Sequence, residues 1–219
     1  MKRDYFNTFE ESDFRICEDM EFNSENKNIF IPMEAWFDVD KKFGINIIGD
    51  DSAWVNLFAE YNPVIGEIRM FYDIDTENKA FEREYVMTDE ERSTITQYIE
   101  KMCMKRHHVP CMEFYITEYI ETCDCEIDLE CRQEGNVCRV YNTNDGAILY
   151  QEDMGGNLSK HIGHKIELAN YGDGECYSIE CMDCNEVLFS SDAERIGLQD
   201  IEDNDGQEMH IRGGECLWR

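Results

Sequence analysis

Two short pairs of potential metal ligands constrain this sequence more than any other feature. His161 and His164 form the first pair, and Cys181 and Cys184 form the second, each with two residues between its members. The sixteen residues between the pairs are enough for one β-hairpin. A hairpin of that length brings its two ends together, so four nitrogen and sulfur ligands can surround one tetrahedral metal ion.

The stretch from His161 to Phe189 resembles a zinc-ribbon knuckle, with the difference that its first pair is His-His. The resemblance implies one bound Zn²⁺, and four protein ligands would complete its coordination, so the ion would be structural rather than catalytic. Cys176 is an alternative ligand that could replace one histidine. The other interpretation is an unmetallated cysteine pair in a hairpin.

A second group of potential ligands lies at the end of a predicted helix and comprises Cys103, His107, His108 and Cys111. Cys103 and His107 are four residues apart and therefore share a helix face. A purely structural role suits them equally, because Cys103 completes an apolar stripe and histidines are favourable at a helix C-terminus. We favour the structural role and leave a second metal site open.

Residues 1–120 predict an α+β domain in which one main helix lies across an antiparallel sheet. Alternating apolar and polar residues, bounded by turn residues, indicate its strands; they are expected within 29–48, 53–61, 67–74 and 80–87.

The main helix is expected to begin at Thr88, because Glu91 completes a capping box with it. The helix should end before Pro110, which cannot continue it. Residues 111–120 are rich in aromatic and β-branched residues, which favour a strand.

Residues 121–219 predict a second, acidic and β-rich domain that contains the zinc-ribbon-like hairpin at about 158–190. Residues 123–131 alternate strictly, with cysteines, Ile and Leu on one side and carboxylates on the other; the outward row is Asp124, Glu126, Asp128 and Glu130. Strand geometry would space these carboxylates about 6.6 Å apart, which is comparable with, but not equal to, the roughly 3.4 Å between phosphates along one DNA strand. The row is therefore a candidate partner-binding surface, although a solvated strand face with Cys123, Cys125 and Cys131 in the core is the simpler interpretation.

The charge balance excludes several classes of function. The chain has 49 acidic and 20 basic residues and a formal net charge of −29, so it repels nucleic acids and anionic lipids. Its first residues contain no apolar run typical of a secretory signal, and no stretch approaches the ~20 apolar residues of a membrane helix. We therefore expect a cytoplasmic protein with reduced thiols, in the host-cell cytoplasm if a phage or mobile element encodes it.

Common enzyme motifs are missing from the sequence. It contains no phosphate-binding loop, nucleophile elbow, H-E-x-x-H motif or dinucleotide fingerprint, and His161 does not begin the H-x-E of zinc deaminases. We therefore expect a non-enzymatic protein. A further hypothesis is a hydrolase or transferase whose metal site is completed by residues that these motifs do not identify.

In size, charge and absence of catalytic motifs, the chain resembles the anti-restriction and anti-CRISPR proteins of phages and mobile elements. This resemblance is compositional and transfers no residues. It implies an acidic DNA mimic that inhibits a basic nucleic-acid-binding defence protein such as a nuclease. The alternative is a zinc-stabilised protein–protein interaction module.

Overall fold

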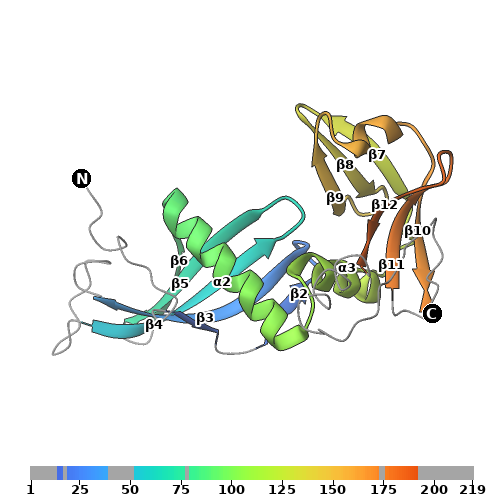
Figure 1. Ribbon diagram of the computed structural model, residues 1–219. Helices are drawn as coiled ribbons and strands as arrows, with labels where there is room; N and C mark the ends of the chain where they lie inside the picture. The colour runs from blue at the N-terminus through green and yellow to red at the C-terminus, as the bar shows by residue number, and fades with distance from the viewer. Residues whose placement is uncertain (1–13, 17–18, 39–51, 77–78, 173–175, 192–219) are drawn as a thin grey trace, which may run out of the picture.

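Two antiparallel sheets, with helices beside and between them, make up the described part of the protein (Figure 1). The computed structural model describes residues 14–16, 19–38, 52–76, 79–172 and 176–191. Within these residues the protein is mostly β, and the α-helices are α2 (Asp89–His107) and α3 (Cys111–Thr122). The expected α+β class, with one main helix and a zinc-ribbon-like half, is therefore wrong, because the metal hairpin belongs to a full six-stranded sheet.

The first sheet has the strand order β1-β3-β4-β5-β6, with β2 pairing on β3. Its strands are β1 (Phe14–Ile16), β2 (Glu21–Asn23), β3 (Asn28–Asp38), β4 (Ser52–Asn62), β5 (Glu67–Thr76) and β6 (Lys79–Tyr85). The long strands form the antiparallel meander that the alternation of the sequence predicted.

The first sheet uses its two faces differently. Ile31, Leu57 and Met70, from three neighbouring strands, are at most 3% exposed and belong to the core on which α2 packs. Alternate residues point the other way, and there the Phe58 and Phe71 rings stack with centroids 5.0 Å apart. The period of two in the sequence therefore sets which face carries the helix.

The start of α2 forms as its sequence predicts. The Thr88 hydroxyl accepts a hydrogen bond from the Glu91 backbone N–H at 3.2 Å, and the Glu91 carboxylate accepts one from the Thr88 N–H at 2.7 Å. The helix ends at His107, and His108 follows in the left-handed conformation with φ 60°. Arg92 ties the helix to the sheet by donating to the Ile68 carbonyl.

The predicted strand at 111–120 is wrong, because this segment is the helix α3. Its buried residues recur at helical spacing, as Cys111, Tyr115 and Tyr119 do, so apolar positions line one long stripe. Tyr115 and Tyr119 are fully buried. The energy of burying these two rings overrides the β preference of the local composition.

Helix α3 lies between the two sheets (Figure 1). On one side, the Phe22 ring of β2 meets the rings of Tyr115 and Tyr119 edge-on, at 5.5 and 6.2 Å. On the other, the Tyr115 hydroxyl donates to the Ile148 carbonyl of the second sheet at 3.2 Å. The buried residues of both sheets form one hydrophobic cluster with α3 at its centre.

The second sheet has the order β12-β11-β10-β7-β8-β9. Its strands are β7 (Leu129–Glu134), β8 (Val137–Asn142), β9 (Ile148–Asp153), β10 (Ile166–Tyr171), β11 (Cys176–Cys181) and β12 (Glu186–Ser190), and the 3-10 helix η2 (Asn157–His161) precedes β10. Strands β7 and β10 pair through Ile166 and Leu129 alone. The sheet therefore consists of two three-stranded units that meet at one residue pair.

The strand expected over 123–131 begins only at Leu129. Its four carboxylates, Asp124, Glu126, Asp128 and Glu130, are exposed as expected, but the first three precede the strand. They therefore do not form a row with regular strand spacing. The division into domains at residue 120 stays a prediction, and its last part, 192–219, lies outside the described residues.

Among the described residues, neither α-helix has the length and hydrophobicity needed to cross a lipid bilayer.

Candidate metal centre

The predicted hairpin forms and carries the ligand pairs at its open end. Strands β10 and β11 are antiparallel, with Ile166 opposite Cys181. His161 ends η2, and His164 lies in the turn that leads into β10. Cys184 lies in the turn between β11 and β12. The four residues span 23 positions of the sequence. They come together because the end of η2, the turn before β10 and the β11–β12 turn are neighbours in the fold.

The ligand atoms of His161, His164, Cys181 and Cys184 all lie within 4.8 Å of one another, so this group could hold a metal ion. His164 Nδ1 lies 3.5 Å from the Cys181 sulfur and 3.3 Å from the Cys184 sulfur. Metal–sulfur and metal–nitrogen bonds of about 2.3 and 2.0–2.1 Å at a tetrahedral angle place nitrogen and sulfur about 3.5 Å apart. The two distances from His164 to the sulfurs are therefore those expected of a tetrahedral centre.

His161 is the most unusual member of the group, because it is fully buried and neither of its ring nitrogens makes a hydrogen bond. Its Nε2 atom does lie 3.0 Å from a Glu186 carboxylate oxygen, a distance suited to an ion pair. Leaving a buried imidazole without hydrogen bonds costs on the order of 1–3 kcal/mol. A metal bond to His161 would satisfy one of its two ring nitrogens.

The turns around the site are held together by backbone geometry. Gly163 has φ 77° and Asn185 has φ 56°, values that favour residues tolerating the left-handed region. The Lys165 N–H donates to the Asp183 carboxylate, and the Met182 N–H donates to the Lys165 carbonyl, both at 2.9 Å. These two bonds hold the histidine turn against the cysteine turn.

Cys176, the alternative ligand, is not part of the group. It begins β11, opposite Tyr171 at the far end of the hairpin. Its buried sulfur lies 3.8 Å from the Ser190 hydroxyl. The group that could hold a metal ion therefore consists of the two predicted ligand pairs, His161 with His164 and Cys181 with Cys184.

The second predicted group does not converge in the described structure. Cys103 and Cys111 are both buried between α2 and α3, and the Cys111 sulfur faces the Ile99 carbonyl at 3.9 Å. The His107 ring packs on Phe114 instead, with centroids 4.5 Å apart. No three of Cys103, His107, His108 and Cys111 bring ligand atoms together among the described residues. The hydrogen bond with Cys103, and after it burial, raises the pKa of Cys111, so the Cys111 thiol keeps its proton.

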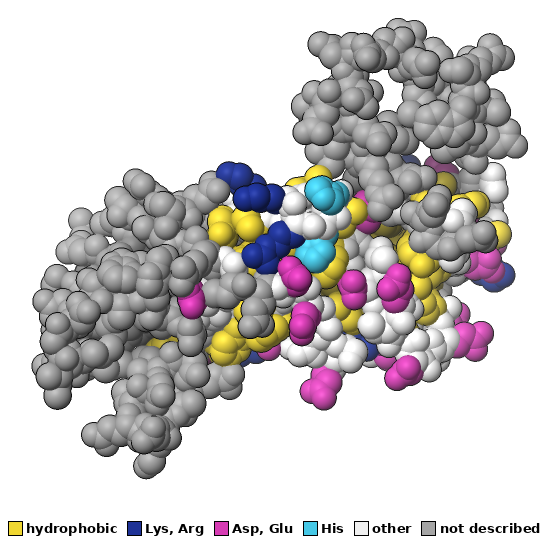
Figure 2. Space-filling model, turned by 90° about the horizontal axis from the view of Figure 1, so that it is seen from below, with side chains coloured by type: hydrophobic (Ala, Val, Ile, Leu, Met, Phe, Trp, Pro, Cys, Tyr) yellow, Lys and Arg dark blue, Asp and Glu magenta, His cyan; other side chains and the backbone are white. Residues whose placement is uncertain are grey.

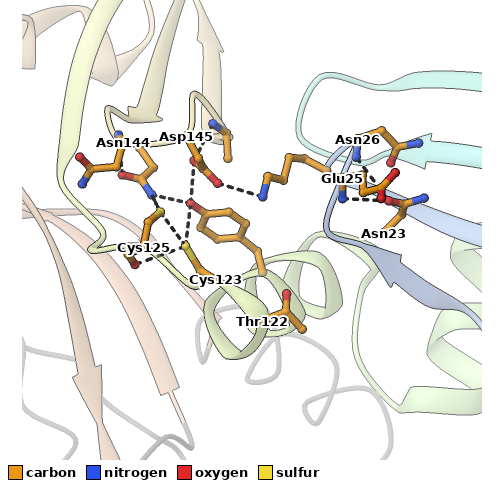
Figure 3. A network of polar contacts seen from close by, with 12 residues as sticks. Asn23, Glu25, Asn26, Thr122, Cys123, Cys125, Asn144 and Asp145 are labelled. Carbon is orange, nitrogen blue, oxygen red and sulfur yellow. Dashed lines mark hydrogen bonds and ion pairs between the residues drawn. The ribbon is translucent and has the colours of Figure 1, made fainter.

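Sequence reasoning missed a further polar cluster, which contains Cys123, Cys125 and Asp145 (Figure 3). It placed the two cysteines in the core, but both are only partly buried, and their sulfurs lie 3.1 Å apart. Cys131, the third of that set, is 1% exposed as expected. The Cys-x-Cys spacing was visible in the sequence, whereas the approach of Asp145 depends on the turn between β8 and β9.

The predicted acidic row is less uniform than its sequence. Glu130 pairs with Arg132 at 2.7 Å, and this hydrogen bond lowers the pKa of Glu130. Asp128 accepts a hydrogen bond from the Thr143 hydroxyl at 3.2 Å. In the view of Figure 2, dark blue and cyan side chains gather in one area and the acidic ones are scattered around it. The described part of that face is therefore not a continuous acidic surface.

Comparison with protein-family models, with curated proteins and with solved structures finds no match for this chain.

Proposed function

We propose that this protein is a non-enzymatic protein-binding module whose second sheet is fastened by one structural Zn²⁺. The observation that carries the proposal is the convergence of two imidazoles and two thiols at tetrahedral spacing around His164. The fully buried His161, whose ring nitrogens make no hydrogen bond with a described residue, also supports it.

The donor set favours zinc over harder cations. Thiolate and imidazole ligands in tetrahedral arrangement suit Zn²⁺, whereas Ca²⁺ and Mg²⁺ require six or more oxygen ligands. Four protein ligands leave no position for water or substrate, so the ion would stabilise the fold rather than react. The ligands come from η2, the turn before β10 and both ends of the β11–β12 turn, so the ion would hold these segments to one another.

Metal analysis of the purified full-length protein tests this centre. We expect one zinc per chain, and loss of that zinc in the Cys181→Ser and His164→Ala variants. The matched control is Cys176→Ser, which removes a buried thiol from the same strand but outside the group. Metal-free protein that melts at the same temperature with and without added zinc would refute the proposal.

For the partner, we propose a basic nucleic-acid-binding protein, such as a nuclease of a defence system, which the chain would inhibit by occupying its nucleic-acid channel. The support is the net charge of −29 and the exposure of Asp124, Glu126, Asp128 and Glu130. Complementary charge accelerates association and favours such partners over acidic ones. The support is electrostatic and does not depend on a strand-like spacing of carboxylates. A zinc-stabilised interaction module in another pathway is the alternative.

A pull-down at low salt, with identification of the bound proteins, tests this choice. Binding to a basic nuclease should weaken steeply as salt rises and should be lost when DNA is added. The variant that neutralises Asp124, Glu126, Asp128 and Glu130 should bind less than a control that neutralises four other exposed acids, Glu21, Glu25, Glu90 and Asp153. Binding that persists at high salt and together with DNA would refute the proposed inhibitor and favour the zinc-stabilised interaction module.

A further inference from the structure

Two thiols meet at the end of α3, outside the candidate metal centre. Cys123 is the residue that caps the C-terminus of α3, and Cys125 follows after one residue. Their sulfur atoms lie 3.1 Å apart, about 1 Å more than the length of a disulfide bond. Figure 3 shows both side chains pointing into one polar network between the two sheets.

The network gives the two thiols different environments. The Cys123 sulfur contacts the Tyr119 hydroxyl at 3.6 Å and the Cys125 carbonyl at 3.5 Å. Burial raises the pKa of Cys123, but hydrogen bonds with the Cys125 thiol and with Tyr119 outweigh it and hold that pKa below its usual value. The hydrogen bond with Cys123 raises the pKa of Cys125 instead. One thiol is thus suited to attack, and the other keeps its proton.

Accessibility separates this pair from the other cysteines that the structure describes. Cys123 and Cys125 are partly exposed, whereas Cys184 is exposed and belongs to the candidate metal centre. The rest are buried: Cys103, Cys111, Cys131, Cys138, Cys176 and Cys181. Outside the candidate metal centre, Cys123 and Cys125 are therefore the described cysteines that are not buried.

A second metal ion fits this cluster less well than a dithiol does. Both Asp145 carboxylate oxygens are engaged, one by the Tyr119 hydroxyl at 3.1 Å and the other by the Lys27 ammonium at 2.9 Å. A cation there would meet the positive charge of Lys27. Two thiolates on tetrahedral zinc lie about 3.8 Å apart, which is longer than the distance between the Cys123 and Cys125 sulfurs.

We propose that Cys123 and Cys125 form a reversible thiol–disulfide exchange site for small disulfides of the glutathione type. The Cys123 thiolate attacks one sulfur of the oxidised glutathione, whose S–S bond breaks, and the first glutathione leaves as a thiolate that takes up a proton. Cys125 then loses its proton and attacks the Cys123 sulfur, which releases the second glutathione. The protein dithiol loses two electrons and two protons, and one small disulfide becomes two thiols.

The exchange changes the contact between the two halves of the chain. In the reduced state the Asn142 amide donates to the Cys125 sulfur at 3.4 Å and to the Tyr119 hydroxyl at 2.6 Å. In the disulfide, Cys123 has no thiol proton to donate to the Tyr119 hydroxyl. The disulfide also closes a small ring that contains one intervening residue. Because exposed or strained disulfides are the readily reduced ones, the change is reversible by reduced glutathione.

The test titrates the zinc-loaded full-length protein with increasing ratios of oxidised to reduced glutathione in the absence of oxygen. The reaction is stopped with acid, free thiols are alkylated under denaturing conditions, and the digest is analysed by mass spectrometry. We expect the peptide containing Cys123 and Cys125 to lose two hydrogens first. Cys103, Cys111 and Cys131 should stay reduced during the titration and therefore be alkylated after it. An excess of reduced glutathione should restore both thiols.

Single substitutions assign the two roles. In Cys125→Ser the glutathione should stay on Cys123 as a mixed disulfide, and in Cys123→Ser the remaining thiol should react more slowly. Two results would overturn the proposal: both thiols staying reduced over the whole titration, or a second zinc per chain that Cys123→Ser removes while the first zinc stays. If a variant fails to fold, the titration of the wild-type protein still tests the proposal.

Discussion

Lys27 and Asp145 form an ion pair, with 2.9 Å between Nζ and Oδ2, that joins the first sheet to the second. Lys27 lies in the turn between β2 and β3, where its φ of 57° is left-handed, and Asp145 lies in the turn between β8 and β9. The ammonium also sits 5.6 Å from the centroid of the Tyr119 ring. The Lys27 ammonium, the Tyr119 ring and the Asp145 carboxylate thus meet where the two sheets and α3 come together.

Lys27→Met should destabilise the protein by about 1–2 kcal/mol, because it leaves a partly buried carboxylate without its cation. The two side chains are 25% and 19% exposed, so solvent screens them only in part. Chemical denaturation measures the change. Arg69→Met is the control, because Arg69 and Glu84 form a pair on the open surface and should contribute little. Equal losses in both variants would contradict a special role for Lys27.

The same pair predicts a pH dependence. Burial raises the pKa of Asp145, but the hydrogen bond from the Ala147 N–H and the contacts with Lys27 and Tyr119 outweigh it, so the folded-state pKa lies below its ordinary value of 3.8. A carboxyl group with a lowered folded pKa adds stability above its unfolded pKa and loses it as pH falls through the folded pKa. The stability difference between wild type and Asp145→Asn should therefore be full at pH 6 and shrink below about pH 4. A difference that is constant from pH 6 to pH 3 would contradict this.

Tyr119→Phe should cost about 1–3 kcal/mol, since it removes a buried hydroxyl that serves three partners. The hydroxyl donates to Asp145 and accepts from the Asn142 amide and the Cys123 thiol, and the side chain is fully buried. Thermal and urea unfolding both report the loss. Tyr171→Phe provides the matched control, because Tyr171 is 52% exposed and its hydroxyl donates to Glu180 in solvent. The control should unfold like the wild type.

Glu186→Gln should weaken zinc binding by about tenfold, because a carboxylate beside a ligand histidine orients the ring and increases its basicity. Competition with a zinc chelator of known affinity measures the change. Glu167→Gln is the control in the same hairpin, since Glu167 pairs with Lys165 rather than with a ligand. If both variants keep wild-type affinity, Glu186 does not orient His161.

Short sequence patterns predicted the helix start and the strands that are determined by residues close in the sequence. The capping box at Thr88 and Glu91 placed the start of α2, and alternation placed the meander of β3 to β6. The two ligand pairs converged because a hairpin of fixed length joins them. Each of these depends on residues that are close in sequence or linked by one regular element.

Features that depend on distant contacts escaped prediction. α3 looked like a strand because Tyr115 and Tyr119 favour β structure locally, and only burial between two sheets selects the helix. Cys123 and Cys125 looked like core residues because they alternate in step with Ile127 and Leu129, but the strand begins only at Leu129. The approach of Lys27 to Asp145 spans the chain from the first sheet to the second, and no short pattern encodes it.

The single pairing of Ile166 with Leu129 links the candidate metal centre to the closure of the second sheet. Ile166 follows the histidine turn by two residues and lies opposite the ligand Cys181. The one residue pair that joins the two halves of the second sheet therefore lies beside the candidate centre. Under the zinc proposal, removal of the ion would loosen this junction before the rest of the sheet.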